Sequence, residues 1–219
     1  MGFRIYHYWR SSSSWRVRWA LALKKITYEA VPINLLNDDT LSPEYLAKNP
    51  AGTVPTLEVI QADGSSHFIL ESLAICEYLE EGFPSPPLYP SNSIMRAQAR
   101  AFAEYVNSGI HPLQNLSTLE LLQDKLDENQ RRAFARVAIE KGLTTLEALA
   151  NEQPGPYCYG EHLTIADLCL VPQLYNARRF EVDLKQFPRL LAIESNALQH
   201  ESAQASHPTR FEPAAPSKK

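Results

Sequence analysis

The chain has 219 residues, of which 44% are hydrophobic and 21% charged, a composition typical of globular proteins with a sizeable core. The net charge of −4 gives no reason to expect nucleic acid as a partner, and no apolar run approaches the roughly 20 residues that span a bilayer. The first predicted strand begins almost at the N-terminus, which leaves no room for a signal peptide, and the three cysteines form no CxxC pair. We therefore expect a cytoplasmic protein without a metal site.

The first third of the chain alternates predicted strands and helices. Four apolar or alternating runs read as strands: Phe3–Tyr8, Tyr28–Asn34, Val54–Ile60 and His67–Leu70. Helices are predicted to begin at the serine run Ser11–Ser14, at Ser42 and at Glu71. This order predicts a small four-stranded mixed sheet, parallel at first and ending in a hairpin, with helices packed on it. Pro32 places the second strand at an edge, because proline cannot donate to the ladder.

The serine run Ser11–Ser14 lies where the first strand ends and the first helix begins. The start of a helix offers unpaired N–H groups and a partial positive charge, which favour an anion. A serine hydroxyl there can cap the helix or donate to a bound anion, although four serines would also suit a flexible, capped turn. In the helix, Trp15, Trp19, Ala22 and Leu23 are predicted to share one face, with Arg16 and Lys24 turned away.

The composition changes between Phe83 and Asn92, where four prolines lie within seven residues and predict an interdomain linker. The sequence thus predicts domains over residues 1–82 and 93–219. Everything beyond the linker is helical in pattern. The predicted segments are Ser93–Lys125 with a break near Gly109 and Pro112, Glu128–Asn151, a helix from the Thr164–Asp167 capping box to Arg179, and one from Phe187-Pro188 to Leu198. The tail from Ser206, with Pro208, Pro213 and Pro216, is expected to be loosely held.

A thioredoxin-like first half, a proline linker and an all-helical second half resemble the cytosolic glutathione transferases over nearly the whole chain. The run Ser11–Arg18 is similar to the signature of the zeta class. Further matches follow in the order of the class: Asn49-Pro50, Val54-Pro55-Thr56-Leu57, Ser72-Leu73-Ala74-Ile75, Pro112–Ser117, Ala166–Gln173 and Arg179-Phe180. The chain departs from the class pattern at three positions, with Ser13 in place of cysteine and with Glu71 and His111 in place of glutamine.

The zeta class contains the maleylacetoacetate isomerases of tyrosine and phenylalanine catabolism, and close bacterial relatives isomerise maleylpyruvate. The resemblance implies a homodimer that uses glutathione as a cofactor in the cis–trans isomerisation of a maleyl-type dicarboxylate. The cofactor thiolate adds to the cis double bond, the bond rotates, and glutathione leaves unchanged. Two alternatives stay open, namely glutathione transfer to small halogenated or electrophilic acids and a non-catalytic glutathione-fold binding module.

The resemblance also assigns residues to the cofactor. A free thiol is only about 3% ionised at neutral pH, so the site must lower its pKa. Ser11 is the expected donor to sulfur, with Ser12 and Ser13 as second candidates and Arg10 adding positive charge. The main chain of Val54 would pair with the peptide if the bond to Pro55 is cis. The full set of predicted glutathione-binding residues is Ser11, Ser12, Ser13, Ser14, Trp15, Arg16, Val54, Pro55, Glu71, Ser72, His111, Asn115, Leu116 and Ser117.

For the dicarboxylate substrate, Arg179 is the predicted clamp and Arg10 the next candidate, because guanidinium pairs with carboxylate through two bonds. Arg178 and Arg179 are adjacent, so on a helix they point about 100° apart and one of the two is expected to face the site. His111, Asn115 and Ser117 would line the wall that the helical half supplies. On structural grounds His111 beside Pro112 suits a polar residue at a helix kink rather than a catalytic base.

Overall fold

The computed structural model describes residues 1–213, which form two compact units. Among the described residues, the first unit combines Met1–Pro86 with residues 201–213, and the second is Pro87–His200. The change of unit between Pro86 and Pro87 falls inside the predicted linker. The assignment of residues 93–219 to a single helical domain is wrong at its C-terminal end, because the chain from Glu201 packs with the first unit.

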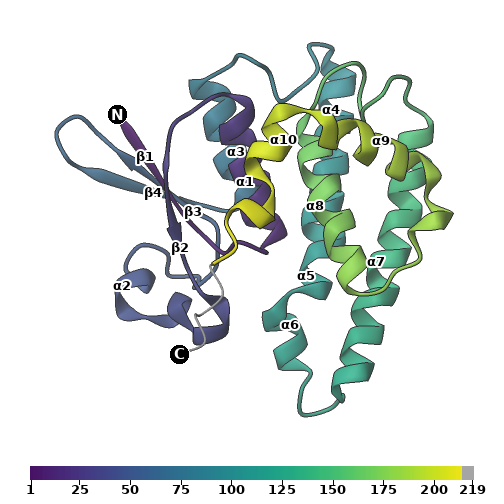
Figure 1. Ribbon diagram of the computed structural model, residues 1–219, viewed down its shortest axis with the longest axis horizontal. Helices are drawn as coiled ribbons and strands as arrows, with labels where there is room; N and C mark the ends of the chain where they lie inside the picture. The colour runs from purple at the N-terminus through teal and green to yellow at the C-terminus, as the bar shows by residue number, and fades with distance from the viewer. Residues whose placement is uncertain (214–219) are drawn as a thin grey trace. The chain divides into compact units, whose positions relative to one another are not determined.

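The first unit contains a four-stranded sheet of order β2-β1-β3-β4 (Figure 1). Its strands are β1 (Gly2–His7), β2 (Glu29–Pro32), β3 (Thr56–Ile60) and β4 (Ser66–Leu70). The β1–β2 pair is parallel and the other two pairs are antiparallel, so the prediction of a mixed sheet is confirmed. Pro32 lies on the edge strand β2, where its missing N–H costs no ladder bond.

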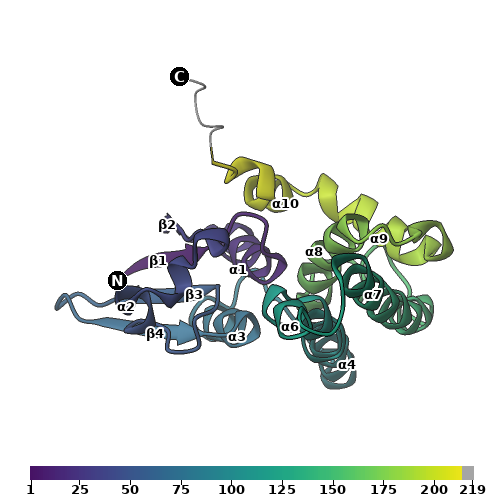
Figure 2. The ribbon, with the colours of Figure 1, turned by 90° about the horizontal axis from the view of Figure 1, so that it is seen from below.

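Helices cover both faces of this sheet. Alternate residues along a strand face opposite sides, and Ile5 of β1 and Leu57 of β3 are paired in register and fully buried. They face α1 (Ser12–Leu23) and α3 (Ser72–Gly82), which pack side by side (Figure 2). Tyr6 faces the other way and meets the ring of Tyr45 in α2 (Pro43–Leu46), which follows two 3₁₀ turns, Leu35–Asn37 and Asp39–Leu41. The expected thioredoxin-like arrangement is confirmed.

Helix α1 is buried on all sides, so the prediction that Arg16 and Lys24 turn away from the core is wrong. Every residue of α1 except Ala22 is buried, because α3 packs on one flank and α10 (Glu201–Ser206) on another. The ammonium of Lys24, just beyond the helix, reaches the carboxylate of Glu80 at 2.7 Å and the carbonyl oxygens of Phe83 and Pro86 at 2.5 and 3.0 Å. Helical periodicity distinguishes one apolar face from one polar face, whereas the sheet, α3 and α10 together cover three sides of α1.

The expected loose tail from Ser206 is also wrong over its first residues. Ser206 is buried at the end of α10, and Pro208 is buried in the 3₁₀ turn Pro208–Arg210. The physical reason is the aromatic surface of α1, which the chain after Glu201 covers. Pro213 is exposed, and Pro216 lies outside the described residues.

The second unit is helical. Its helices are α4 (Ser93–Glu104), α5 (His111–Gln114), α6 (Leu116–Leu121), α7 (Glu128–Asn151), α8 (Ile165–Arg179) and α9 (Pro188–Gln199), with a 3₁₀ turn at Leu184–Gln186. The predicted break near Gly109 is confirmed as a π-helical stretch, Tyr105–Ile110, between α4 and α5. The capping box is confirmed too, since the Asp167 carboxylate accepts from the N–H and the hydroxyl of Thr164, each at 2.8 Å. No helix of residues 1–213 is long and apolar enough to cross a membrane.

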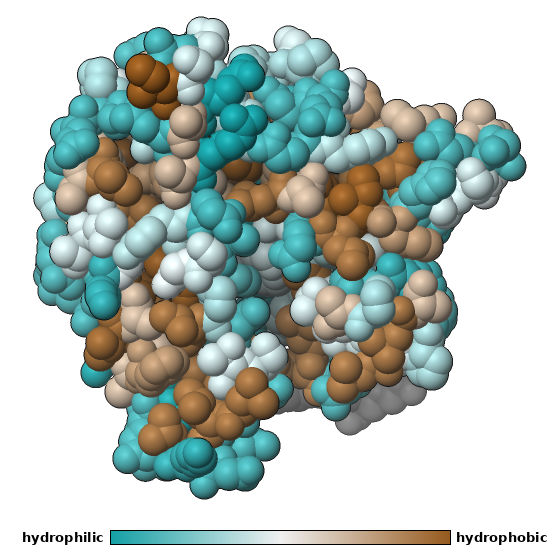
Figure 3. All heavy atoms as spheres, turned by 180° about the vertical axis from the view of Figure 1, so that it is seen from behind, coloured by the Kyte–Doolittle hydropathy of each residue, from teal (hydrophilic) through white to brown (hydrophobic). Residues whose placement is uncertain are grey.

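Several large apolar side chains remain exposed on α5, α6 and α7. They are Leu113, Leu116, Leu121, Phe134 and Val137. Figure 3 shows apolar residues gathered at the end of this unit that α6 forms.

The π-helical stretch packs closely on α7 at Gly142. A Cβ added to Gly142 would lie 2.3 Å from Cγ1 of Ile110, far inside van der Waals contact. We therefore expect Gly142→Ala to lower the free energy of unfolding by about 1–3 kcal/mol, the usual cost of overpacking, despite the higher helix propensity of alanine. Urea unfolding measures this difference. Gly109→Ala is the matched control, because its Cβ would meet Tyr105 at an ordinary 3.6 Å; equal stability of the two variants would contradict the close packing.

Candidate active site

The serine turn at the start of α1 contains a connected set of hydroxyls. Ser11 is the N-cap residue, and its Oγ accepts from the N–H of Ser14 at 3.1 Å. The hydroxyl of Ser13 donates to the carbonyl oxygen of Val54 at 3.1 Å, and Oγ of Ser11 lies 2.9 Å from Oγ of Ser13. A hydroxyl has one proton, so Ser11 must be the donor in the Ser11–Ser13 bond. The Ser11 proton can therefore turn toward a bound anion without breaking the contact between Ser13 and Val54.

Other predicted glutathione-binding residues of this turn are buried. Ser12 and Ser14 are 2% and 0% exposed, and Oγ of Ser14 has no hydrogen-bond partner among residues 1–213. Trp15 is 1% exposed and donates from Nε1 to Oγ of Ser206 at 3.1 Å. The main-chain N–H groups of Ser14 and Trp15 already donate to Ser11, at 3.1 and 2.9 Å. From these three residues we therefore expect packing support rather than side-chain contacts to a ligand.

Arg10 is held beside the serine turn by aromatic side chains. Its Nη2 donates to the hydroxyl of Tyr8 at 3.2 Å, and its guanidinium lies 5.3 Å from the centre of the Trp9 ring. Cation–π contact of this kind holds the charge of a half-buried arginine without an acidic partner. Arg10 therefore contributes a fixed positive charge one residue before Ser11.

The loop that contains Val54 is anchored by groups that the sequence analysis did not single out for this role. The Val54-Pro55 bond is cis. The Asn49 amide donates to the carbonyl of Thr53 at 2.8 Å and to the hydroxyl of Thr56 at 2.9 Å. The Tyr45 hydroxyl also contacts both. The main chain on each side of Val54 is thus fixed. The match of Asn49-Pro50 to the zeta class was the sequence signal that could have indicated the role of Asn49.

Glu71 and Ser72 form the third feature. Glu71 occupies the N-cap position of α3 with φ 67°, a left-handed conformation that costs a glutamate on the order of 1–3 kcal/mol and is typical of functional sites. Its carboxylate is exposed, whereas Ser72 is 2% exposed. Nη1 of the buried Arg16 donates to Oγ of Ser72 at 3.1 Å. Because that bond uses a lone pair, the Ser72 proton stays available for a carboxylate.

These three features of the first unit fit one kind of ligand. Ser72 and the N–H groups at the start of α3 suit a carboxylate, and the exposed Glu71 carboxylate suits an ammonium group. Val54 presents extended main chain, and Ser11 presents a hydroxyl donor at a helix N-terminus. An α-amino acid end, a peptide unit and a thiolate would satisfy them, and these are the parts of glutathione.

In the second unit, the structure distinguishes Arg178 from Arg179. Arg178 forms two bonds with the buried carboxylate of Glu194, at 2.6 and 2.5 Å, and this partner raises the pKa of Arg178. Arg178 is therefore a structural residue. Arg179 is exposed, and its Nη1 donates to Oδ1 of Asn176 at 2.9 Å. Of the two, Arg179 remains the candidate clamp.

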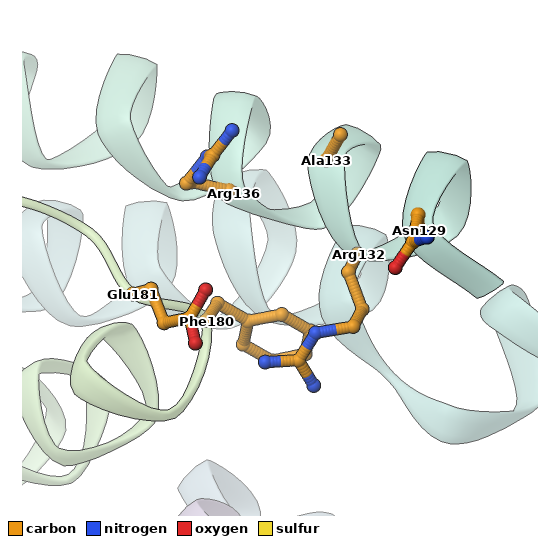
Figure 4. Close-up of a pocket in the computed structure, with 6 residues that line it drawn as sticks. All are labelled: Asn129, Arg132, Ala133, Arg136, Phe180 and Glu181. Atoms are coloured by element: carbon orange, nitrogen blue, oxygen red, sulfur yellow. The ribbon is translucent and has the colours of Figure 1, made fainter.

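A pocket of about 200 Å³ lies beside the end of α8 (Figure 4). It is lined by Asn129, Arg132, Ala133, Arg136, Phe180 and Glu181. The Arg132 guanidinium lies 5.8 Å from the centre of the Phe180 ring and donates to the carbonyl oxygen of Arg179 at 3.0 Å. None of the predicted site residues lines this pocket. The bond from Arg132 holds the main chain at the end of α8.

The remaining predicted residues lie around the junction of α5 and α6. His111 begins α5 and is half-buried, Asn115 separates the two helices, and Leu116 and Ser117 are exposed in α6. Gln114 fixes this junction to α8. Its amide and that of Gln173 exchange two hydrogen bonds, at 2.9 and 3.0 Å, in the core of the second unit. These residues belong to the second unit, whereas the serine turn belongs to the first.

The described part of the chain has neither an exposed cysteine thiol nor a cluster of metal-binding side chains. Cys76, Cys158 and Cys169 are all buried, and burial raises the pKa of the Cys158 thiol. Among residues 1–213, no group of three or more histidine, cysteine or acidic side chains could hold a metal ion.

Comparison with known proteins agrees with this geometry. The family model for the glutathione S-transferase N-terminal domain matches residues 10–81, and that for the glutathione S-transferase C-terminal domain matches residues 115–203. The fold is that of a glutathione S-transferase.

Individual relatives narrow the class. Maleylacetoacetate isomerase of Mus musculus is 45% identical over 94% of this chain and 92% of its own, and that of Pseudomonas aeruginosa is 41% identical over 94% and 95%. A solved maleylacetoacetate isomerase from Anaeromyxobacter dehalogenans, with bound GSH in the active site, has a TM-score of 0.89 at 44% identity and 98% coverage of both chains. A maleyl pyruvate isomerase of the zeta class has a TM-score of 0.90 at 33% identity, covering 97% of this chain and all of its own. The chain belongs to the maleylacetoacetate isomerase family of zeta-class glutathione S-transferases.

The hydroxyl arrangement makes Ser11 the expected donor to the glutathione sulfur. Ser11→Ala should raise the thiol pKa of bound glutathione by about 1–2 units, since a hydrogen bond to a charged group is worth about 1.5–3 kcal/mol. Ultraviolet titration of the thiolate measures the shift.

Ser11 also caps α1, so the loss of a cap needs its own control. Ser42 caps α2 in the same manner, accepting from the N–H of Tyr45 at 3.2 Å. Ser42→Ala should lower stability and leave the thiol pKa unchanged. A normal titration curve for Ser11→Ala, together with a shifted one for Ser13→Ala, would transfer the role to Ser13.

Proposed function

We propose that this protein is a glutathione-dependent cis–trans isomerase that converts maleylacetoacetate to fumarylacetoacetate in tyrosine and phenylalanine catabolism. The observation that carries the proposal is the serine turn, in which the Ser11 proton can be redirected to a thiolate at the start of α1. The identities of 41–45% to maleylacetoacetate isomerases over nearly the whole chain support the choice of substrate. The proposal includes a cytoplasmic homodimer, and sedimentation at the mass of a single chain would contradict that part.

Each group of residues has a distinct task in this reaction. Bound glutathione supplies the sulfur nucleophile whose reversible addition turns the cis double bond into a single bond that can rotate. Ser72 and Glu71 hold its α-amino acid end, and Val54 pairs with its peptide unit. Ser11 stabilises the sulfur anion, assisted by the dipole of α1 and the charge of Arg10. Arg179 of the second unit holds a substrate carboxylate.

The cysteines favour isomerisation over reductive dehalogenation. Dehalogenation through a mixed disulfide with the protein needs an accessible protein thiolate, and Ser13 stands where the class has cysteine. The three cysteines of the chain are buried, and each is 0% exposed. Isomerisation uses the sulfur of glutathione alone, so the hydroxyl of Ser13 suffices.

Substrate assays test the proposal directly. The protein is incubated with maleylacetoacetate and, separately, with maleylpyruvate, each with and without a catalytic amount of glutathione. We expect rapid isomerisation of maleylacetoacetate that requires glutathione and leaves its concentration unchanged. A preference for maleylpyruvate would identify that compound as the substrate instead. Net consumption of glutathione would indicate a transferase. Failure to turn over either compound would indicate a non-catalytic binding module.

Adjacent arginines provide a matched pair for the substrate clamp. Arg179→Lys loses the two-bond geometry for carboxylate, and we expect kcat/KM to fall by about 1.5–3 kcal/mol, roughly 10- to 100-fold, with unchanged glutathione affinity. Arg178→Lys disturbs the bonds to buried Glu194 and should lower thermal stability with little effect on KM. Steady-state kinetics and glutathione calorimetry on both variants separate the roles. Parallel losses in glutathione and substrate binding for Arg179→Lys would make that residue structural.

A further inference from the structure

Arg18 of α1 is a fully buried arginine whose hydrogen bonds go to main-chain carbonyls and a histidine. Its Nη1 and Nη2 donate to the carbonyl oxygens of Tyr8 and Trp9 at 3.4 and 3.0 Å, and Nε donates to that of Ser206 at 3.3 Å. Nη1 also donates to Nδ1 of His7 at 3.0 Å, which requires a neutral imidazole. Burial and the charge of Arg18 lower the pKa of His7 to about 3, in agreement with a neutral ring.

Three of these groups come from opposite ends of the chain. Tyr8 and Trp9 lie in the turn that leads from β1 to the N-cap Ser11, whereas Ser206 ends α10. The Phe211 ring covers the guanidinium, with its centre 4.7 Å from Cζ of Arg18 and 5.3 Å from the centre of the His7 ring. Glu201–Phe211, which we call the C-terminal segment, therefore closes over a charge that is bonded to the turn before Ser11.

Indole contacts fix the C-terminal segment to the same helix. Nε1 of Trp15 donates to Oγ of Ser206 at 3.1 Å, and Nε1 of Trp19 donates to Oγ of Ser202 at 2.9 Å. The His207 ring meets the Trp15 ring edge to face, with centres 5.0 Å apart. The segment is thus held along α1 by Trp15 and Trp19, and Arg18 connects it to the Tyr8–Trp9 turn.

A buried guanidinium without a carboxylate partner constrains its surroundings. Among the ion pairs of residues 1–213 there is none with Arg18, and its charge is met by the three carbonyl dipoles, Nδ1 of His7 and the Phe211 ring. Moving any of these carbonyls would leave a buried charge poorly solvated, which is costly in a medium of low dielectric constant. The turn is held all the more closely because the Tyr8 carbonyl also accepts the N–H of Ser11, at 3.1 Å.

We propose that Arg18 is a positioning residue that connects the C-terminal segment to the serine turn, so that residues Ser206 and Phe211 help set the position of the Ser11 hydroxyl. This inference rests on the proposed function, in which Ser11 donates to the glutathione sulfur. A hydrogen bond weakens steeply with distance and angle. A serine turn that loses its bonds to Arg18 would therefore stabilise the thiolate less well, even with Ser11 intact. Glutathione affinity would change less, because Val54, Glu71 and Ser72 are not among the groups that Arg18 contacts.

Thiolate titration of bound glutathione tests the inference without reference to turnover. We expect Phe211→Ala and Arg18→Lys to lower the thiolate fraction at pH 6.5 at least threefold, while the Kd for glutathione changes less than the thiolate fraction. Trp19→Phe is the matched control, because it removes the bond to Ser202 on the same segment and leaves the bonds from Arg18 to the turn in place. It should lower the unfolding temperature and leave the titration curve as in the parent protein. Lys25→Ala, which removes an exposed ion pair with Glu201, should change neither.

The Ser11→Ala background shows whether the effect passes through Ser11. If it does, adding Phe211→Ala to Ser11→Ala should give no further change in the thiolate fraction. Additive losses, or a Phe211→Ala protein that is less stable but titrates normally, would overturn the inference and leave Arg18 a structural residue. If Arg18→Lys does not fold, Phe211→Ala carries the test alone. Absence of any thiolate signal in the parent protein would instead contradict the proposed function.

Discussion

Two arginines buried within α1 constrain most of the first unit. Arg16 and Arg18 are each 0% exposed, and two positions apart on a helix they point about 200° away from each other. Arg16 therefore extends toward α3 and donates to Ser72, and Arg18 extends toward the turn after β1 and the C-terminal segment. Burying two cations in one helix is unfavourable unless neighbouring groups are placed to meet them, so the partners of Arg16 and Arg18 gain fixed positions. Those positions are the two ends of the candidate glutathione site.

The candidate site is consequently rigid where its chemistry needs rigidity. The Ser13 hydroxyl joins α1 to the Val54 loop, which Asn49 and Tyr45 hold from behind. The unfavourable backbone of Glu71 persists because β4 ends one residue before it and α3 begins one residue after it. The Ser11 proton is the exception, since it can turn from Ser13 to a ligand at little cost. A single mobile hydroxyl in a fixed frame is a suitable arrangement for stabilising an anion that forms and disappears during each turnover.

The second unit uses neutral pairs and ion pairs for the same purpose. The reciprocal amides of Gln114 and Gln173 hold the short helices that follow the π-helical stretch, and they do so without burying a charge. Arg178 and Glu194 secure α8 to α9.

The sequence by itself determined the features that depend on neighbours along the chain. The order of strands and helices follows from periodicity and turn residues, Pro32 marks an edge strand because it lacks an N–H, and Thr164 and Asp167 form a capping box because they lie three residues apart. Ser11 at a strand-to-helix junction, and the dispersed matches to the zeta class, also needed only the sequence. Residue patterns of this kind reflect interactions between residues close together in the chain, and these interactions are retained in the folded structure.

Tertiary structure alone decided which charges are buried and what they hold. Arg16 and Lys24 fall on the polar side of a two-faced helix, yet the fold covers that side, and the tail expected to be loose closes over α1. The bond from Arg16 to Ser72 joins residues 56 apart in the chain, and that from Arg18 to Ser206 joins residues 188 apart. The choice between Arg178 and Arg179 likewise rested on Glu194, sixteen residues beyond Arg178. No periodicity connects such positions, because their proximity exists only after α1, α3 and α10, or α8 and α9, have packed together.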